Sequence, residues 1–158
     1  MPAQRQEPSK KLAYTLGTST RSLEDFLDIL KKYEIKQVVD VRSFPKSRRF
    51  PHFNRESLSH HLIQQGINYV WMGQELGGFR SGGYEKYMQT PNFSEGLENL
   101  IVLIEKAPTV IICAEKLPWR CHRRFISQKL ADKGIKVIHI IEKGQTWPSL
   151  QKLILKIL

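Results

Sequence analysis

Short apolar segments rich in Val, Ile and Tyr alternate with amphipathic helical segments from residue 12 onward. Five segments have β character, and their apolar residues are continuous rather than alternating: 12–16, 37–41, 67–71, 109–113 and 137–141. Continuous apolar strands separated by helices are typical of a parallel sheet whose two faces are both covered. The pattern therefore predicts an α/β protein, a single three-layer domain with a mainly parallel sheet of about five strands and helices on both faces.

The length of the chain restricts its organisation further. A chain of 158 residues buries one core of its own, so we expect residues 12–158 to form a single α/β domain after a flexible N-terminal lead-in at residues 1–11. No apolar run approaches the ~20 residues of a membrane-spanning helix, and no signal peptide pattern follows the N-terminus. Two cysteines do not make a disulfide scaffold. The sequence predicts a cytoplasmic protein without a membrane partner.

Capping and turn residues indicate where the helices begin and end. Ser22 is a candidate N-cap for the first helix and Asn54 for the second. Pro118 fits the first position of a later helix, where its missing N–H has no cost. Five of the ten glycines lie in residues 73–83, which favours a mobile loop. Residues 150–158 form a last amphipathic segment.

The formal net charge of +10 is concentrated in two segments. Residues 42–55 contain five basic residues and residues 116–124 contain four, and neither segment contains an acidic residue. The other 16 basic residues face all 15 acidic residues, so the remainder of the chain is nearly neutral. A local excess of this kind predicts a binding site for an anionic small molecule or a nucleic acid. No sequence feature indicates a protein partner.

Phenylalanines are interleaved with the cations of the first basic segment, at Phe44, Phe50 and Phe53. Basic residues alternating with aromatic ones are typical of a surface that holds a phosphate backbone and stacks on bases. The alternative is a solvated charged loop with its phenylalanines packed beneath it. Because the second basic segment is equally free of acids, we favour anion binding.

Polar side chains follow the predicted strands at the points where the strands end. In an open parallel sheet the carboxyl ends of the strands form one edge, and ligands bind there. We predict that this edge binds the anion through Thr18, Ser19, Arg42, Arg48, His52, Asn54, Arg120 and Arg123. Catalytic candidates on the same edge are Asp40, Cys113, Glu115, Cys121 and His122. No sequence feature indicates a cofactor.

Each catalytic candidate has a structural alternative. Asp40, Glu115 and His122 are acid–base candidates, and Asp40 is equally suited to an ion pair that seats the following loop. Cys113 ends an apolar strand, where a buried structural thiol is common. Cys121 falls in the first turn of the helix predicted from Pro118, where the helix dipole and neighbouring cations favour a thiolate. Its alternative is simple packing against the helix.

Metal binding is not predicted, although two cysteines and a histidine follow the fourth strand. Their spacing is not that of a zinc knuckle, and no second C-x-x-C is present. The neighbouring arginines also oppose a divalent cation.

Four motifs, in order, resemble the domain-of-unknown-function family 488. They are Tyr14-Thr15-Leu16-Gly17-Thr18-Ser19-Thr20-Arg21, Val39-Asp40-Val41-Arg42-Ser43-Phe44-Pro45, Leu76-Gly77-Gly78, and Cys113-Ala114-Glu115 followed by Cys121-His122-Arg123. The resemblance covers roughly residues 12–141, and it implies no assigned reaction. The family commonly has His at the position of Thr18. A looser likeness to rhodanese-like and cysteine-phosphatase architecture rests on a strand that ends in Cys113, followed by a loop and by Arg120 at a helix start.

The sequence supports two hypotheses about function. The first is a small enzyme that acts on a phosphate-bearing substrate, a nucleotide or nucleic acid, at the carboxyl edge of the sheet. Whether it is an enzyme is left open by the residues, and a hydrolase and a transferase both fit Cys, His, Asp and Glu chemistry. The alternative is a non-catalytic nucleic-acid-binding module that uses the two basic loops.

Overall fold

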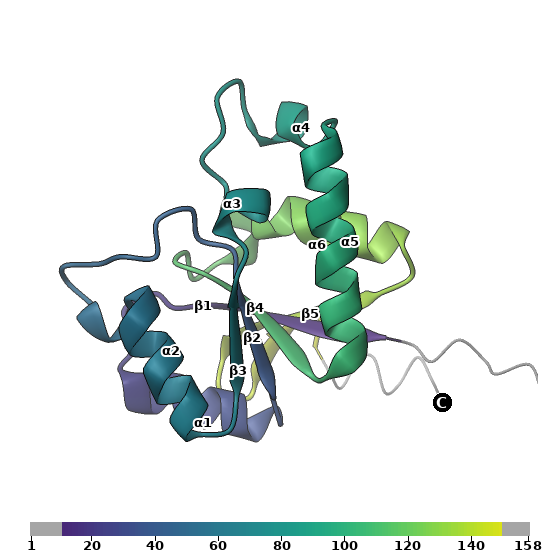
Figure 1. Cartoon of the computed structure of the whole chain (residues 1–158). Helices are drawn as coiled ribbons and strands as arrows, with labels where there is room; N and C mark the ends of the chain where they lie inside the picture. Colours follow the sequence, from purple (N-terminus) through teal and green to yellow (C-terminus); the bar gives the residue numbers. More distant parts are fainter. Residues whose placement is uncertain (1–10, 150–158) are drawn as a thin grey trace, which may run out of the picture.

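A six-stranded sheet in the order β3-β2-β4-β1-β5-β6 forms the centre of the computed structural model, which describes residues 11–149 (Figure 1). The strands are β1 Leu12–Gly17, β2 Gln37–Asp40, β3 Asn68–Trp71, β4 Thr109–Cys113, β5 Lys136–Glu142 and β6 Gln145–Trp147. The first five are parallel, and β6 pairs antiparallel with β5. The α/β class and the mainly parallel sheet are confirmed.

Six α-helices connect or flank the strands within residues 11–149. They are α1 Leu23–Lys32, α2 Arg55–Gln64, α3 Gly73–Leu76, α4 Tyr84–Tyr87, α5 Pro91–Lys106 and α6 Arg123–Asp132. Ser22 caps α1 as predicted, because its side chain accepts a hydrogen bond from the Asp25 N–H. Thr90 caps α5 in the same way.

Buried side chains form two core clusters on opposite faces of the sheet. Neighbouring residues of one strand enter different clusters, as the alternation of side chains along a strand requires. Ile111 and Cys113 of β4 pack with side chains of α5 and α6, whereas Val110 and Ile112 pack with side chains of α1 and α2. Figure 1 shows these two helix pairs on different sides of the strands.

Several predicted elements differ from the observed ones. The sheet has six strands rather than about five, because residues 145–147 add a short edge strand after a turn. Residues 73–83 are not loop throughout, since α3 occupies the first four of them. Asn54 stands at the N-cap position of α2, yet its side chain does not cap the helix. It accepts a hydrogen bond from the Ser47 N–H at 2.6 Å instead. The amphipathic segment 150–158 and most of the predicted lead-in lie outside the described residues.

The helix predicted from Pro118 is divided. Pro118–Arg120 form one turn of 3-10 helix, and α6 begins only at Arg123. Cys121, between them, has an extended backbone with φ −139° and ψ 172°. The prediction that Cys121 lies in the first turn of a helix is therefore wrong. Its sulfur instead accepts a hydrogen bond at 3.3 Å from the N–H of Arg123, the first residue of α6.

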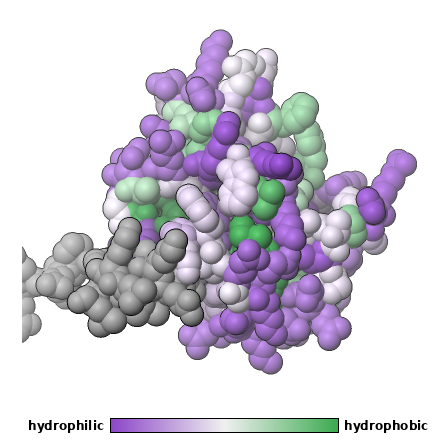
Figure 2. Space-filling model, turned by 180° about the vertical axis from the view of Figure 1, so that it is seen from behind, coloured by the Kyte–Doolittle hydropathy of each residue, from purple (hydrophilic) through white to green (hydrophobic). Residues whose placement is uncertain are grey.

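Hydrophilic side chains cover much of the molecular surface seen from behind, with apolar side chains in small separate areas (Figure 2). Within residues 11–149, no helix combines the length and the apolar character that crossing a lipid bilayer requires.

Candidate active site

Cys113 lies at the carboxyl ends of two neighbouring strands, β1 and β4, whose connections leave toward opposite sides of the sheet. It ends β4 and is the register partner of Gly17, which ends β1. From β1 the chain passes through α1 to β2 on one side, and from β4 it passes through α6 to β5 on the other. Neighbouring parallel strands whose connections part in this way leave a crevice at their carboxyl ends, which is the usual ligand site of open α/β sheets. The topology places Cys113 at this point.

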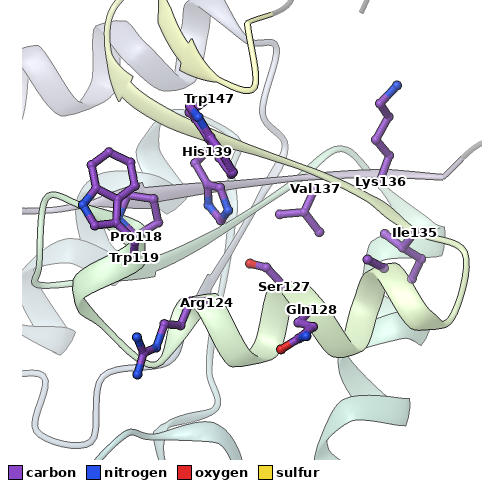
Figure 3. A pocket seen from close by; sticks show the side chains of 11 residues that line it. Pro118, Trp119, Arg124, Ser127, Gln128, Ile135, Lys136, Val137, His139 and Trp147 are labelled. Carbon is purple, nitrogen blue, oxygen red and sulfur yellow. The ribbon is translucent and has the colours of Figure 1, made fainter.

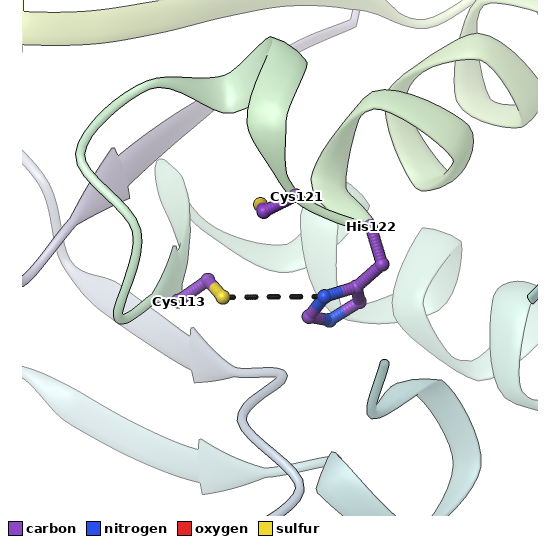
Figure 4. A group of neighbouring side chains, drawn as sticks. All are labelled: Cys113, Cys121 and His122. Carbon is purple, nitrogen blue, oxygen red and sulfur yellow. Dashed lines mark hydrogen bonds between the residues drawn. The ribbon is translucent and has the colours of Figure 1, made fainter. Parts of the chain in front are cut away.

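Cys113, Cys121 and His122 form one cluster (Figure 4). The two Sγ atoms and a ring nitrogen of His122 all lie within 4.8 Å of one another. Cys113 Sγ is 4.0 Å from His122 Nδ1, the long end of a nitrogen–sulfur hydrogen bond. Cys113 is 8% exposed, and the other two side chains are half-buried. Three of the five predicted catalytic residues are therefore brought together.

The orientation of the His122 ring is fixed by its backbone neighbours. Nε2 lies 3.0 Å from the carbonyl oxygen of Val41. Because a carbonyl only accepts, Nε2 carries a proton, and in the neutral ring the unprotonated Nδ1 faces Cys113. A Cβ on Gly78 would lie 2.5 Å from Nδ1, so only glycine leaves the ring in place. Burial lowers the pKa of His122, and Arg123 adds to this effect, so the ring is neutral at pH 7 and its Nδ1 is free to accept a proton.

The surroundings of Cys113 favour its thiolate. A hydrogen bond from the Cys121 thiol lowers the pKa of Cys113 to about 6, against the opposing effect of burial. The backbone N–H groups of Glu115 and Ala114 and the charge of Arg123 act in the same direction. The pKa of Cys121 is raised, because its proton is held in the hydrogen bond to Cys113 and because it is buried. The pair thus shares one negative charge, and we assign it to Cys113.

Arg123 holds several groups in and around the cluster in place through hydrogen bonds. Its side chain is fully buried and donates from Nε to Cys121 Sγ at 3.1 Å, from Nη1 to Thr15 Oγ1 at 3.1 Å, and from Nη2 to the Glu115 carbonyl oxygen. All three nitrogens have protein partners, so Arg123 is not an anion ligand. It polarises Cys121, which in turn donates to Cys113.

The cluster meets some of the requirements of a metal site. Two thiolates and an imidazole are ligands of zinc, and the second His122 nitrogen already donates to a carbonyl, as in many zinc sites. The guanidinium of Arg123, which donates to Cys121 Sγ, places a positive charge in contact with one of these ligands. Because this charge opposes the binding of a metal cation, we interpret the cluster as a thiol–imidazole group.

Asp40 forms the buried ion pair that was one of its two alternatives. Its carboxylate accepts from the Arg42 N–H, from Arg42 Nε at 2.9 Å and from Arg42 Nη2 at 2.7 Å. The Tyr69 hydroxyl donates to the same carboxylate at 2.5 Å. Asp40 is 0% exposed and Arg42 is 7% exposed, and Arg42 Nη2 also donates to the Phe53 carbonyl. The burial of both side chains and their protein partners favour the ion pair that seats the loop over a general base at Asp40 and an anion ligand at Arg42.

The other predicted anion ligands are divided between the interior and the surface. Thr18 is buried, and the backbone N–H groups of Thr18 and Ser19 donate to the carbonyls of Cys113 and Ala114. His52 donates from Nε2 to the Arg21 carbonyl at 2.8 Å. These groups and Asn54 hold loops together. The exposed members of the predicted set are Arg48 and Arg120. Glu115, which was predicted as an acid–base residue, is exposed as well.

A cavity of about 700 Å³ lies beside the cluster but does not include it (Figure 3). Trp119 and Trp147 form one wall, α6 the other, and His139 lies between them. His139 Nδ1 accepts from the Thr15 hydroxyl, which itself accepts from Arg123. This hydrogen-bond chain separates the cavity from the thiols. Ser127 Oγ, in the cavity wall, has no hydrogen-bond partner in the described part of the chain.

Some residues of the site have no clear signal in the sequence. Tyr84 lies against His122 with ring centroids 5.4 Å apart and a tilt of 53° between the rings, and Thr15 links Arg123 to His139. Tyr84 lies outside every predicted helix and strand, and Thr15 belongs to the first motif without having been predicted as a site residue. Gly78 does have a signal, because it belongs to the Leu-Gly-Gly motif, but its contact with His122 depends on the tertiary fold.

Comparison with protein families matches residues 22–130, well over half of the chain, to the family described as Domain of unknown function DUF488. No curated protein and no solved structure matches the chain. The match confirms the resemblance to this family and covers three of the four motifs, while the first motif, residues 14–21, lies before the matched range.

Proposed function

Because the chain belongs to the DUF488 family, whose description names no reaction, we propose a function from its own site: a cysteine-dependent hydrolase or transferase for a phosphate-bearing substrate. Cys113 is the nucleophile, His122 moves the proton, and Cys121 donates a hydrogen bond to the Cys113 sulfur. The observation that supports this most is the position of Cys113, at the diverging point of the sheet with Cys121 Sγ and His122 Nδ1 beside it.

The proposed reaction has two balanced halves. The Cys113 thiolate attacks the phosphorus of a phosphate ester, the sulfur–phosphorus bond forms, the ester phosphorus–oxygen bond breaks, and the leaving oxygen takes a proton from water. In the second half, neutral His122 accepts a proton at Nδ1 from the water that attacks the phosphorus, and the sulfur–phosphorus bond breaks to restore the thiolate. Nδ1 then releases this proton to the solvent, where it neutralises the hydroxide left by the first half. In a transferase, an acceptor hydroxyl replaces water.

The exposed cations support an anionic substrate. Arg120 and Arg124 are exposed on either side of Cys121 and His122, and Lys46, Arg48 and Arg49 are exposed on the loop after β2. Cations beside a cleft attract phosphate groups and stabilise the charge that develops on them. A nucleotide or a nucleic acid fits this charge. A cytoplasmic location fits as well, since both cysteines are free thiols and that compartment keeps thiols reduced.

A non-catalytic nucleic-acid-binding module is the second candidate. The exposed cations beside aromatic residues in the loop after β2 favour it. It differs from the first candidate in one respect that is simple to test, because a binding module needs neither thiol.

Hydrolysis of p-nitrophenyl phosphate and of bis(p-nitrophenyl) phosphate tests the proposed reaction. We expect Cys113→Ser to abolish release of nitrophenolate and His122→Gln, which keeps a donor for the Val41 carbonyl, to lower kcat about 100-fold. A phosphoryl adduct on the Cys113 peptide after acid quench would identify the intermediate. Turnover of neither ester by the wild type, or a wild-type rate in Cys113→Ser, overturns the proposal. Circular dichroism of each variant verifies folding.

A further inference from the structure

Two exposed phenylalanines, on the two loops that contact His122, touch each other. Phe44 is 71% exposed and Phe79 is 81% exposed, and their rings meet edge to face with centroids 5.7 Å apart. Burial of large apolar side chains is favourable, and these two remain in water. Such an exposed pair indicates a surface that a partner covers. Phe53, by contrast, is buried in the core and Phe50 is half-buried beneath Arg49.

Both phenylalanines are attached to the loops that hold His122. The Val41 carbonyl accepts from His122 Nε2, and Phe44 follows three residues later. Gly78 packs against the His122 ring, and Phe79 is the next residue. The Ser43 hydroxyl accepts from the Phe79 N–H at 3.1 Å and ties the two loops together. The aromatic pair is therefore anchored to the catalytic histidine by short backbone paths.

The loop that presents Phe44 is held by its own hydrogen bonds. The Arg55 N–H donates to the Pro45 carbonyl at 2.9 Å, and the Lys46 N–H donates to the Phe44 carbonyl at 2.8 Å. The Ser47 hydroxyl accepts from the Phe50 N–H at 3.0 Å. Loops that are ordered before binding lose less conformational entropy when a ligand arrives. The phenylalanine pair is thus a preorganised surface.

Positive charge lies directly beside the pair. Lys46, Arg48 and Arg49 are exposed on the same loop, and no acidic residue occurs between positions 42 and 55. Arg80, on the other loop, is engaged with the Tyr87 ring and with the Gln74 and Gly77 carbonyls. Aromatic rings combined with exposed cations match a ligand that has both planar rings and phosphates.

We propose that Phe44 and Phe79 form a base-stacking platform for a single-stranded nucleic acid, whose phosphates lie along Lys46, Arg48 and Arg49. The platform deepens the proposed function, on which its role in substrate delivery rests, because it identifies the phosphate-bearing substrate as a nucleic acid strand. A base stacked on this pair would leave a neighbouring phosphodiester close to the loops around His122.

Fluorescence anisotropy with labelled oligothymidylate tests the platform. We expect the double variant Phe44→Ala/Phe79→Ala to bind it at least about tenfold more weakly than the wild type. The same variant keeps its affinity for an abasic oligomer of equal length, which has phosphates but no bases. Trp147→Ala is the matched control, because it removes a 59% exposed aromatic side chain from the opposite edge of the sheet. It leaves binding unchanged.

The outcome for the platform is separable from the outcome for catalysis. Cys113→Ser removes the proposed nucleophile and leaves oligothymidylate affinity as in the wild type. Loss of ester hydrolysis in Cys113→Ser together with undiminished oligothymidylate binding by the phenylalanine variant refutes the platform alone. No binding of oligothymidylate by the wild type at low salt, or equal losses for oligothymidylate and the abasic oligomer, also overturns it. Both phenylalanines are exposed, so the double variant retains its fold.

Discussion

At the scale of single residues, the charge on Cys113 depends on a short chain of donors. Arg123 donates to Cys121 Sγ. The Cys121 sulfur lies within 4.8 Å of the Cys113 sulfur, and its thiol lowers the pKa of Cys113 by hydrogen bonding. Each hydrogen bond polarises the next in a buried site, so the guanidinium acts on Cys113 through Cys121. Cys121 is then a positioning residue, and its effect is on the proton affinity of its neighbour.

Alkylation by iodoacetamide reports this effect. We expect the labelling rate of Cys113 to rise with pH around a midpoint of about 6, because its pKa is lowered to that value by the hydrogen bond from Cys121. Cys121→Ala removes the donor and moves the midpoint toward the ordinary 9.0, whereas Cys121→Ser keeps a donating hydroxyl and moves it less. Lys116 lies between the two thiols, so tryptic peptides identify the labelled one. Equal midpoints in both variants would contradict the role of Cys121.

His139 provides a second prediction at this scale. Burial, with a contribution from Arg123, lowers the pKa of His139 from 6.5 to about 4. Between pH 6.5 and pH 4, His139 is therefore protonated in the unfolded chain but not in the folded chain, and the free energy of unfolding falls as pH decreases through this window. The loss in free energy of unfolding over the whole window is about 3 kcal/mol. Chemical denaturation at pH 7 and pH 4.5 measures it. His139→Asn, which still accepts from Thr15, loses less stability on acidification than the wild type, and an identical loss argues against the lowered pKa.

At the scale of elements, the end of β2 is fixed by charge rather than by apolar packing alone. Asp40 ends the strand, and its carboxylate holds Arg42 and Tyr69 in the positions from which the next loop departs. The pKa of Tyr69 is raised by burial and by the charge of Asp40, so its hydroxyl remains a donor. This arrangement places the Val41 carbonyl against His122.

Asp40→Asn is expected to destabilise the fold by about 3 kcal/mol, because Arg42 would remain buried without its counter-charge. Tyr69→Phe removes one neutral donor and costs about 1 kcal/mol. Urea denaturation at pH 7 measures both variants. Stability of Asp40→Asn equal to that of the wild type would show that the ion pair does not seat the loop.

The elements themselves show which sequence signals are sufficient. β4 has the predicted bounds, since a continuous Val-Ile-Ile run leaves no other placement once both faces are buried. β6 has only three residues and becomes a strand by pairing with β5, so its own pattern carries no signal. Pro118 satisfies the rule for a helix start equally well in a 3-10 turn, and only the tertiary path of the following residues separates it from α6.

The candidate site was predictable in its location and not in its contacts. Strand ends place Cys113 and His122 on one edge. The buried state of Arg42 and Arg123 follows from partners that are distant in the sequence, such as Tyr69 for the Asp40–Arg42 pair and Thr15 for Arg123. A local count of charges treats a buried, fully paired arginine and an exposed one alike.

At the scale of the whole molecule, only some of the basic side chains in segments 42–55 and 116–124 remain available to a ligand, because others are buried or paired with protein groups. Arg42 and Arg123 are buried among partners, Lys116 pairs with Glu142, and Arg55 stacks on Trp71. The cations of these segments that are exposed and without an ion pair in the described chain are Lys46, Arg48, Arg49, Arg55, Arg120 and Arg124. Arg49, Arg55 and Arg124 among them lie over aromatic rings. The excess of +10 is thus a poor measure of the field at any one place, and the position of a charge matters more than the total.

Two variants with the same net charge separate position from total. Arg48→Gln/Arg49→Gln and Lys31→Gln/Lys32→Gln each remove two exposed positive charges, the first beside the phenylalanine pair and the second at the end of α1. If the +10 charge acted as a whole, both would weaken oligothymidylate binding equally. We expect only the arginine variant to do so, and the slope of log K against log salt to become shallower by about 0.7 for each phosphate that the variant no longer neutralises. Anisotropy titrations over a range of sodium chloride concentrations provide both slopes, and equal changes in the two variants would assign the binding to net charge instead of to this loop.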